Sequence, residues 1–156
     1  MALERARVYL EQRGYGDRLI VLEASSATVA LAAEALGVAE SRIAKTLSFL
    51  VEERPVLILT EGRARIDNRK FKERFRQKAK MIPPERVEAL VGHAPGGVCP
   101  FGVNEGVQIY LDESLKPFDT VFPAAGDDHS AVRLSIAELE DCADHIGWVD
   151  VCRIEE

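Results

Sequence analysis

The stretch of sequence whose residue types and spacing best suit chemistry spans residues 92–106, which are rich in glycine and proline. It contains five of the eleven glycines and two of the seven prolines in the chain. Glycine permits positive φ angles and close approach of a ligand, whereas proline fixes φ and lacks a backbone donor. A stiff loop of this composition can present backbone N–H groups to an anion, a carboxylate or a developing oxyanion. The alternative is an ordinary connection between a helix and a strand.

Two side chains in this loop could support nucleophilic chemistry. His93 and Cys99 lie six residues apart. A thiolate attacks when a base or a lowered pKa activates it, and imidazole can be that base. One hypothesis is therefore a Cys99-dependent hydrolase of a small molecule. Because no third group that would orient His93 is evident, the competing interpretation places Cys99 in a pocket wall.

Lys45 stands in a segment whose apolar residues recur at every second position. Ile43, Leu47, Phe49 and Val51 share one face with Lys45 if the segment is extended. Burying a lysine charge is costly, so a lysine on an apolar face suggests a function. The alternative is that Lys45 stands at the entry of the strand and extends its ammonium to solvent.

The charged residues are unevenly distributed. The net charge of −6 argues against general nucleic-acid binding, yet residues 63–80 hold nine basic and two acidic residues. Such a basic segment suggests a local surface that faces phosphates. Within it, Arg69, Lys72 and Arg76 fall on one exposed helix face. The alternative is that this face is simply solvated.

Composition bounds the class of protein. A chain of 156 residues with 47% apolar and 29% charged residues predicts a globular protein of one domain, residues 1–156. No apolar run is long enough to span a membrane, and the first residues do not resemble a signal peptide. The three cysteines lack CxxC spacing, which fits a reducing cytoplasm.

Apolar periodicity, capping residues and turn residues predict the elements that must position these groups. Helices are expected over residues 2–13, 29–36, 68–77 and 83–91, and after Ser135. Strands are expected over residues 19–22, 43–51, 56–59, 107–112, 118–123, 131–134 and 148–152. Strands in runs, interrupted by helices without regular alternation, predict an α+β fold.

Three blocks of sequence together resemble the YbaK/EbsC family of aminoacyl-tRNA deacylases, which is related to the editing insertion of bacterial prolyl-tRNA synthetases. The first block, residues 28–47, ends in Ile43-Ala44-Lys45-Thr46-Leu47, similar to the family's IAK(T/S)L. The second, residues 96–102, is similar to its GGxSPFG loop. The third is the order of the remaining elements, which includes Ala125-Gly126 before the strand at 131–134. The resemblance extends from about residue 20 to the end of the chain.

The resemblance implies an α+β fold with a curved, mixed and mostly antiparallel sheet, barrel-like and flanked by helices. It also implies hydrolysis of the ester that joins a wrong amino acid, such as cysteine or alanine, to tRNA(Pro). No metal or cofactor is expected. The implied partners are the aminoacylated 3′ end of tRNA and prolyl-tRNA synthetase.

The resemblance also assigns roles to residues. Lys45 corresponds to the family's essential lysine and is the expected catalytic residue. The expected substrate-binding residues are Gly96, Gly97, Val98, Cys99, Pro100, Phe101, Gly102 and Gly126. Arg69, Lys72 and Arg76 would form the tRNA-facing surface. The attacking group remains open between water, a group on the substrate and Cys99.

The sequence departs from the family pattern at two places. Cys99 stands where the family often has serine, and Asn104 and Glu105 stand where more basic residues are expected. A module that binds aminoacyl ends or a synthetase without turnover is a further alternative. The run Asp127-Asp128-His129 is interpreted as a solvated loop, since no partner motif completes a metal site.

Overall fold

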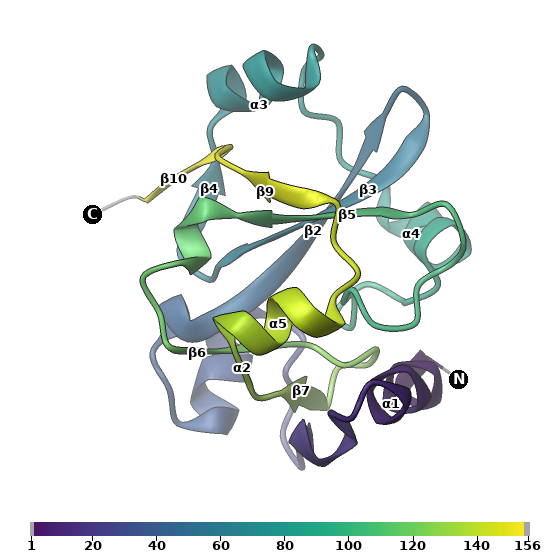
Figure 1. The fold of residues 1–156 in the computed structure, drawn as a ribbon, viewed down its shortest axis with the longest axis vertical. Helices are drawn as coiled ribbons and strands as arrows, with labels where there is room; N and C mark the ends of the chain where they lie inside the picture. Colours follow the sequence, from purple (N-terminus) through teal and green to yellow (C-terminus); the bar gives the residue numbers. More distant parts are fainter. Residues whose placement is uncertain (1, 155–156) are drawn as a thin grey trace.

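The computed structural model describes residues 2–154 and is built around a six-stranded mixed sheet (Figure 1). The strand order is β8-β6-β2-β3-β5-β9. These strands are β8 (Leu134–Ser135), β6 (Thr120–Pro123), β2 (Ile43–Val51), β3 (Arg54–Glu61), β5 (Gln108–Asp112) and β9 (Gly147–Val149). Two small sheets pair β1 (Leu19–Val21) with β7 (Ser130–Val132), and β4 (Ala64–Ile66) with β10 (Cys152–Ile154).

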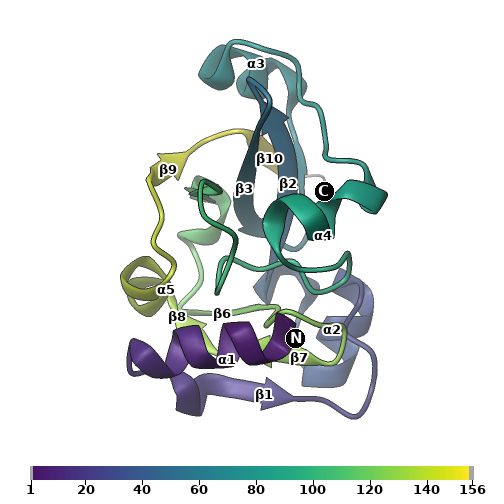
Figure 2. The ribbon, with the colours of Figure 1, turned by 90° about the vertical axis from the view of Figure 1, so that its right-hand side faces the viewer.

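Helices lie at both ends of the described fold and beside its sheet (Figure 1). They are α1 (Ala2–Gln12), α2 (Val29–Leu36), α3 (Asn68–Phe75), α4 (Pro84–Val91) and α5 (Ile136–Cys142), with short 3₁₀ turns η1 (Gly16–Arg18), η2 (Glu40–Arg42) and η3 (Glu113–Leu115). Helix α3 lies at one end, whereas α1 and α2 lie at the other end beside β1 and β7 (Figure 1, Figure 2). No helix in the described part of the chain is long and apolar enough to cross a membrane.

The sheet is mixed and curled, which confirms the predicted α+β class. The central hairpin of β2 and β3 is antiparallel and pairs Ala44 with Glu61 at one end and Val51 with Arg54 at the other. Within the six-stranded sheet three of the five pairings are parallel. Antiparallel pairing prevails, at four of seven, only when the two small sheets of the described chain are included.

Local capping explains where several helices begin. The Thr28 side chain accepts a hydrogen bond from Leu31 N at 3.2 Å and so begins α2. Asp67 caps α3 by accepting from two backbone N–H groups of its first turn. Ser135 and Glu138 form a reciprocal capping box at the start of α5. Each cap satisfies donors that a helix N-terminus leaves without partners, and all three helices begin within one residue of the predicted position.

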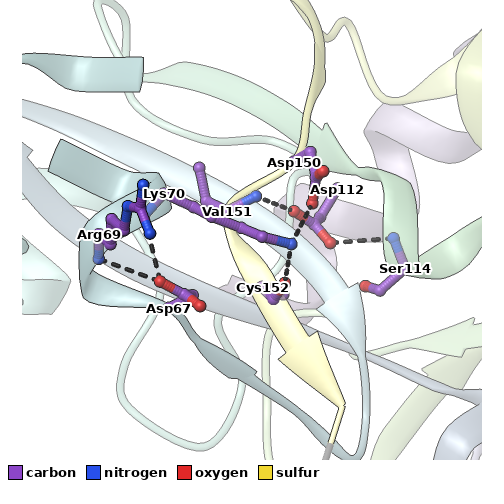
Figure 3. A network of polar contacts seen from close by, with 8 residues as sticks. All are labelled: Asp67, Arg69, Lys70, Asp112, Ser114, Asp150, Val151 and Cys152. Atoms are coloured by element: carbon purple, nitrogen blue, oxygen red, sulfur yellow. Dashed lines mark hydrogen bonds and ion pairs between the residues drawn. The ribbon is translucent and has the colours of Figure 1, made fainter. Parts of the chain in front are cut away.

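The last predicted strand, residues 148–152, is wrong as a single element, because it is two strands with different partners. Strand β9 pairs with β5, and β10 pairs with β4, a strand that the sequence did not predict. Between them the Val151 N–H donates to Asp112 Oδ1 at 2.9 Å, and Ser114 N donates to Asp112 Oδ2 at 2.9 Å (Figure 3). The Asp112 carboxylate thus accepts from the Val151 N–H, which in one continuous strand would donate to a neighbouring strand.

The same network holds α3 against the C-terminal strand (Figure 3). The Lys70 ammonium donates to Asp150 Oδ1 at 3.1 Å and to the Cys152 carbonyl at 2.9 Å. Its carboxylate partner Asp150 raises the pKa of Lys70 above its usual value. Helix α3 is therefore fixed by polar contacts as well as by its buried Phe71.

The two faces of β2 pack differently. Leu47, Phe49 and Val51 lie in an apolar cluster with Phe71 of α3, which confirms the predicted alternation over this part of the strand. Phe49 and Phe71 have ring centroids 4.9 Å apart. The opposite face of β2 carries Ala44, Thr46 and Ser48, and residues of both faces, Lys45 among them, line the candidate site.

Candidate active site

A cavity of about 270 Å³ opens beside β2 between segments that are far apart in the sequence. Its apolar wall consists of Val29, Ala32, Ile43, Ala44, Phe122 and Ala131. Met81, which follows the basic segment, lies at its rim and is 56% exposed. The volume approaches the lower end of the range for small-ligand sites in proteins.

Besides Lys45, five residues with a hydroxyl side chain line the cavity. They are Ser26, Thr28, Thr46, Ser48 and Ser130. Among the described residues no aspartate or glutamate lines the cavity, and Lys45 is its one basic member. A positively charged group in the cavity would therefore find no carboxylate partner among the described lining residues.

Two of these hydroxyls have no hydrogen-bond partner within the described chain. Thr46 Oγ1 and Ser130 Oγ are both buried and unpaired. Ser26 differs, since its Oγ accepts from Ser130 N at 3.2 Å and donates to the Ser130 carbonyl at 3.3 Å. Sequence analysis missed these residues as site members. Thr46 and Ser48 could have been found as the polar face of an alternating strand, whereas Ser130 gave no local signal.

Lys45 is half-buried in the wall of the cavity. Its ammonium donates to the Ala64 carbonyl at 2.5 Å, so the side chain is held by β4 rather than extended freely into solvent. Burial lowers the pKa of Lys45, and the nearby Cys152 and Glu61 oppose that shift. A lysine in this setting loses its proton more readily than one in water, although its catalytic role stays a prediction.

The glycine loop contributes two residues to the cavity, Gly96 and Val98. Gly97 lies behind them, where an added Cβ would come within 2.5 Å of Asp127 N. Gly126 N donates to the Gly97 carbonyl at 3.0 Å, so these two predicted residues meet at a close backbone contact. Glycine is needed at position 97 to let the two chain segments approach.

The second half of the loop packs into the core. Cys99 and Phe101 are 0% exposed, and neither they nor Pro100 and Gly102 line the cavity. Cys99 Sγ lies 3.5 Å from His93 Nε2, which donates to the Phe101 carbonyl at 2.7 Å. Burial raises the pKa of Cys99 to about 12 and lowers that of His93. Such a thiol is protonated and inaccessible, which is the setting of a structural cysteine.

The three predicted tRNA-facing residues lie on or next to α3. Lys72 is exposed, Arg69 pairs with Glu73 at 3.3 Å, and Arg76 ends the helix with a φ of 61°. Only the short segment 77–80 separates Arg76 from Met81 at the rim of the cavity. The basic segment therefore leads along the chain directly to the site.

The run Asp127-Asp128-His129 forms its own local contacts. His129 Nδ1 lies 2.8 Å from Asp128 Oδ1, and this hydrogen bond lowers the pKa of Asp128. The His129 N–H donates to Asp127 Oδ1 at 3.0 Å. Within residues 2–154 no three histidine, cysteine, aspartate or glutamate side chains are grouped closely enough to hold a metal ion.

Fold and cavity are those of an α+β domain with a small-ligand site beside its central hairpin. The sequence model of one family, the aminoacyl-tRNA editing domain, matches residues 23–142. All residues that line the cavity fall within this range. The match covers more than half of the chain, so the protein belongs to the aminoacyl-tRNA editing domain family.

Individual proteins are similar over different lengths. The uncharacterized protein YwhH of Bacillus subtilis (strain 168) is 45% identical over 98% of each chain. The proposed Cys-tRNA(Pro)/Cys-tRNA(Cys) deacylase EbsC of Enterococcus faecalis (strain ATCC 700802 / V583) is 30% identical over 60% of this chain and 58% of its own length. The crystal structure of a proposed trans-editing enzyme for prolyl tRNA synthetase is 32% identical, with a TM-score of 0.86 over 99% of this chain and 98% of that one. These similarities confirm the predicted resemblance.

Proposed function

We propose that this protein is a trans-editing hydrolase that deacylates mischarged aminoacyl-tRNA, with tRNA(Pro) carrying a wrong amino acid such as cysteine or alanine as its substrate. The observation that carries this proposal is the cavity itself, which has a volume of about 270 Å³ and Lys45 among its lining residues. The similarity to a proposed trans-editing enzyme for prolyl tRNA synthetase supports the choice of tRNA(Pro).

The chemistry needs little from the protein beyond positioning. An aminoacyl ester is already activated, so the enzyme has to hold it and stabilise the oxyanion that forms on its carbonyl. The attacking oxygen or sulfur adds to the carbonyl carbon, and the bond to the ribose oxygen then breaks and releases tRNA with a free hydroxyl. Lys45 would hold the terminal ribose or phosphate or orient the ester, and backbone N–H groups near Gly96 would face the oxyanion.

The attacking group comes from outside the protein in this proposal. The burial of Cys99 and its pKa of about 12 argue against a thiolate mechanism, so water or a group on the substrate remains. If Cys99 were the nucleophile instead, Cys99→Ser would abolish hydrolysis. We expect this variant to retain activity within about threefold, because serine is close to cysteine in size and keeps a donor at a core position that does not line the cavity.

The tRNA body would contact α3 through phosphates. Arg69, Lys72 and Arg76 supply charge rather than base recognition. Charge reversal at these three positions is expected to weaken deacylation of whole tRNA and to reduce its salt dependence. Unchanged activity of the reversed variant would reject this surface.

We assign the whole chain, residues 1–156, to one editing domain that acts in the cytoplasm on the product of prolyl-tRNA synthetase. The deciding experiment measures ester loss from tRNA(Pro) charged with cysteine, alanine or proline. Wild-type protein should hydrolyse a non-cognate ester and spare prolyl-tRNA(Pro). Lys45→Ala should lose at least about 100-fold in kcat/KM, the scale of one electrostatic contact in a transition state.

Lys116→Ala is the matched control, because Lys116 pairs with Glu113 on the surface away from the cavity and its loss should leave hydrolysis unchanged. Full activity of Lys45→Ala would remove Lys45 from the mechanism. Binding of aminoacyl-tRNA by the wild type without loss of any ester would instead favour the non-catalytic binding module.

A further inference from the structure

Met81 differs in its position from the other large apolar side chains that face solvent. In the described part of the chain six such side chains are exposed, namely Val8, Val21, Leu31, Met81, Ile146 and Ile154. Apolar side chains scattered singly over a surface are normal in proteins. Of these six, however, Met81 is the one that lines the cavity. A large apolar surface therefore lies where a molecule bound in the cavity would reach solvent.

The backbone around Met81 is fixed, although the side chain is exposed. Met81 forms an isolated antiparallel bridge with Phe49 of β2. Next to this bridge the Leu50 N–H donates to the Lys80 carbonyl at 2.8 Å. The Gln77 side chain donates to the Leu50 carbonyl at 2.9 Å. The segment that carries Met81 is thus docked on the edge of β2, and a ligand at the rim would meet it in a defined place.

The proposed substrate would extend from the cavity across this rim. The cavity volume of about 270 Å³ is below the range of roughly 300–1,000 Å³ that is typical of sites enclosing a whole drug-sized ligand. With the aminoacyl group inside, the nucleotide that carries the ester therefore lies outside. In tRNA this nucleotide is an adenosine, and its base is attached to the same ribose as the ester. The base must lie close to the mouth of the cavity.

Basic residues lie next to Met81 in the chain. Lys78 and Lys80 are exposed, and neither forms an ion pair with another described residue. The next charged residues toward the C-terminus are Glu85 and Arg86, whose charges cancel. The segment that ends at Met81 therefore presents a net positive charge, which attracts the phosphate of a bound nucleotide.

Another part of the rim carries negative charge. Ala27 lines the cavity and is exposed. A Cβ added at Gly96 would lie 3.5 Å from Ala27 Cβ and 3.7 Å from Asp128 Cβ, so Asp128 is close to this part of the rim. The hydrogen bond with His129 lowers the pKa of Asp128, which keeps its carboxylate ionised at neutral pH. A phosphate is repelled there, so the nucleotide is expected to leave the cavity over Met81.

We propose that Met81, Lys78 and Lys80 form a subsite for the terminal nucleotide of the tRNA, in which the adenine packs on the Met81 side chain and the two lysines bind the phosphate on its 5′ side. This inference rests on the proposed function and adds the place where the substrate is held outside the cavity. A methionine thioether makes favourable contacts with aromatic rings, and a nucleobase offers such a ring face. Met81 is a binding residue in this arrangement and takes no part in the chemistry.

The test is a double-mutant cycle between Met81 and the base. One substrate is 3′-O-alanyl- or 3′-O-cysteinyl-adenosine 5′-phosphate, whichever the wild type hydrolyses faster, and the other is the same ester with hydrogen in place of the base. Loss of the base should lower kcat/KM of the wild type about fivefold, mainly through KM, and that of Met81→Ala by less than about twofold. Met81→Leu, which keeps an apolar side chain of similar size, should respond like the wild type.

Ile146→Ala is the matched control for removing an exposed apolar side chain. Ile146 is 58% exposed, close to the 56% of Met81, and does not line the cavity. This variant should respond to loss of the base as the wild type does. Far-ultraviolet circular dichroism shows that each variant is folded, and the exposure of Met81 makes loss of folding in Met81→Ala unexpected.

The lysines are tested with the nucleotide substrate and the same nucleoside without its 5′-phosphate. Removal of the phosphate should lower kcat/KM of the wild type about fivefold at low salt, and that of the double variant Lys78→Ala/Lys80→Ala by less than about twofold. Lys116→Ala is the control and should behave like the wild type, because Lys116 pairs with Glu113 away from the cavity.

Three results would overturn the inference. Loss of the base could cost Met81→Ala as much as the wild type, which would show that Met81 does not contact the base. Met81→Ala could hydrolyse the ethyl ester of the same amino acid as poorly as the nucleotide ester, which would show that Met81 shapes the cavity instead. Loss of the phosphate could cost the double lysine variant as much as the wild type, which would remove the lysines from the subsite.

A binding measurement separates failure of this inference from failure of the proposed function. If the wild type hydrolyses no ester, the hydrolase function fails. Calorimetry then uses 3′-deoxy-3′-alanylamino-adenosine 5′-phosphate, in which a stable amide replaces the ester. Binding that weakens about fivefold in Met81→Ala and is unchanged in Ile146→Ala would support the subsite. Equal binding by the wild type and Met81→Ala, or no binding by either, would reject it.

Discussion

Two polar regions of this protein use the same kinds of atoms in opposite ways. Around Asp112, both carboxylate oxygens accept from backbone N–H groups, at Ser114 and Val151, and the nearby Lys70 ammonium has two acceptors (Figure 3). In the cavity, Thr46 Oγ1 and Ser130 Oγ are buried without a partner in the described chain.

The difference separates buried polar groups that have hydrogen-bond partners from buried polar groups that lack them. A buried group that is satisfied contributes modestly to stability, whereas one left unsatisfied costs free energy in the empty protein. Satisfied groups join α3, β5 and β10. Of the four buried side-chain atoms without a partner among the described residues, two belong to residues that line the cavity, Thr46 and Ser130, and two, in Arg7 and His93, do not.

The largest effect on stability is expected from removing the Asp112 carboxylate. Asp112→Ala should lower the free energy of unfolding by about 2–5 kcal/mol, because two N–H groups lose their acceptor at a residue that is 1% exposed. Urea unfolding followed by circular dichroism measures this loss. Asp112→Asn keeps one acceptor oxygen, so its free energy of unfolding should lie between those of the wild type and Asp112→Ala. A loss below about 1 kcal/mol would mean that water replaces the carboxylate as the acceptor for the two backbone N–H groups.

A second test concerns the backbone contact that shapes the cavity wall. Gly97→Ala would place a Cβ 2.5 Å from Asp127 N and should cost about 1–3 kcal/mol, since backbone rather than a flexible side chain must move. Hydrolysis should fall as well, because Gly96 and Val98 in the lining flank this residue.

Gly147→Ala is its control, since an added Cβ there meets no atom within 4 Å. The control should change the free energy of unfolding by less than about 0.5 kcal/mol. Equal effects of the two substitutions would show that loss of glycine, and not the close contact at Gly97, causes the destabilisation.

Sequence reasoning succeeded where neighbouring residues decide the structure. Helix α2 could be predicted because Thr28 and Gly37 bound a short apolar period, and in the structure Thr28 caps the start of the helix and Gly37 its end. The side of β2 that carries Leu47 and Phe49 followed from strict alternation. These features depend on contacts within a few positions of one another.

It failed where the structure depends on residues far apart in the chain. Strand β4 forms through backbone pairing with β10, in which Arg65 lies opposite Arg153. Neither segment carries enough local signal to predict this pairing. Ser130 reaches the cavity only because β7 pairs with β1, which no spacing in the sequence reveals. The complete burial of Cys99 could not be predicted either, because one glycine-rich motif contains both residues that line the cavity and residues that pack in the core.

The ion pair at α3 offers a smaller test. Lys70→Met should destabilise the protein by about 0.5–1 kcal/mol at pH 7, because both partners are partly exposed and solvent screens their attraction. The folded-state pKa of Lys70 is raised, so the pair stabilises fully below the unfolded pKa of about 10.4 and less as pH rises through the folded value. The difference between variant and wild type should therefore narrow from pH 9 to pH 11. A constant difference would attribute the effect to packing of the lysine stem.

The smallest expected effect comes from comparing two threonines of the central hairpin, one with and one without a hydrogen-bond partner. Thr60→Val removes a hydroxyl that donates to Glu61 and should cost about 1 kcal/mol, whereas Thr46→Val removes one without a partner and should be neutral or stabilise by up to about 0.5 kcal/mol. Both are the same chemical change on neighbouring strands of one hairpin, measured by urea unfolding without substrate. Equal destabilisation would mean that the Thr46 hydroxyl has a hydrogen-bond partner in the folded protein, as the Thr60 hydroxyl does.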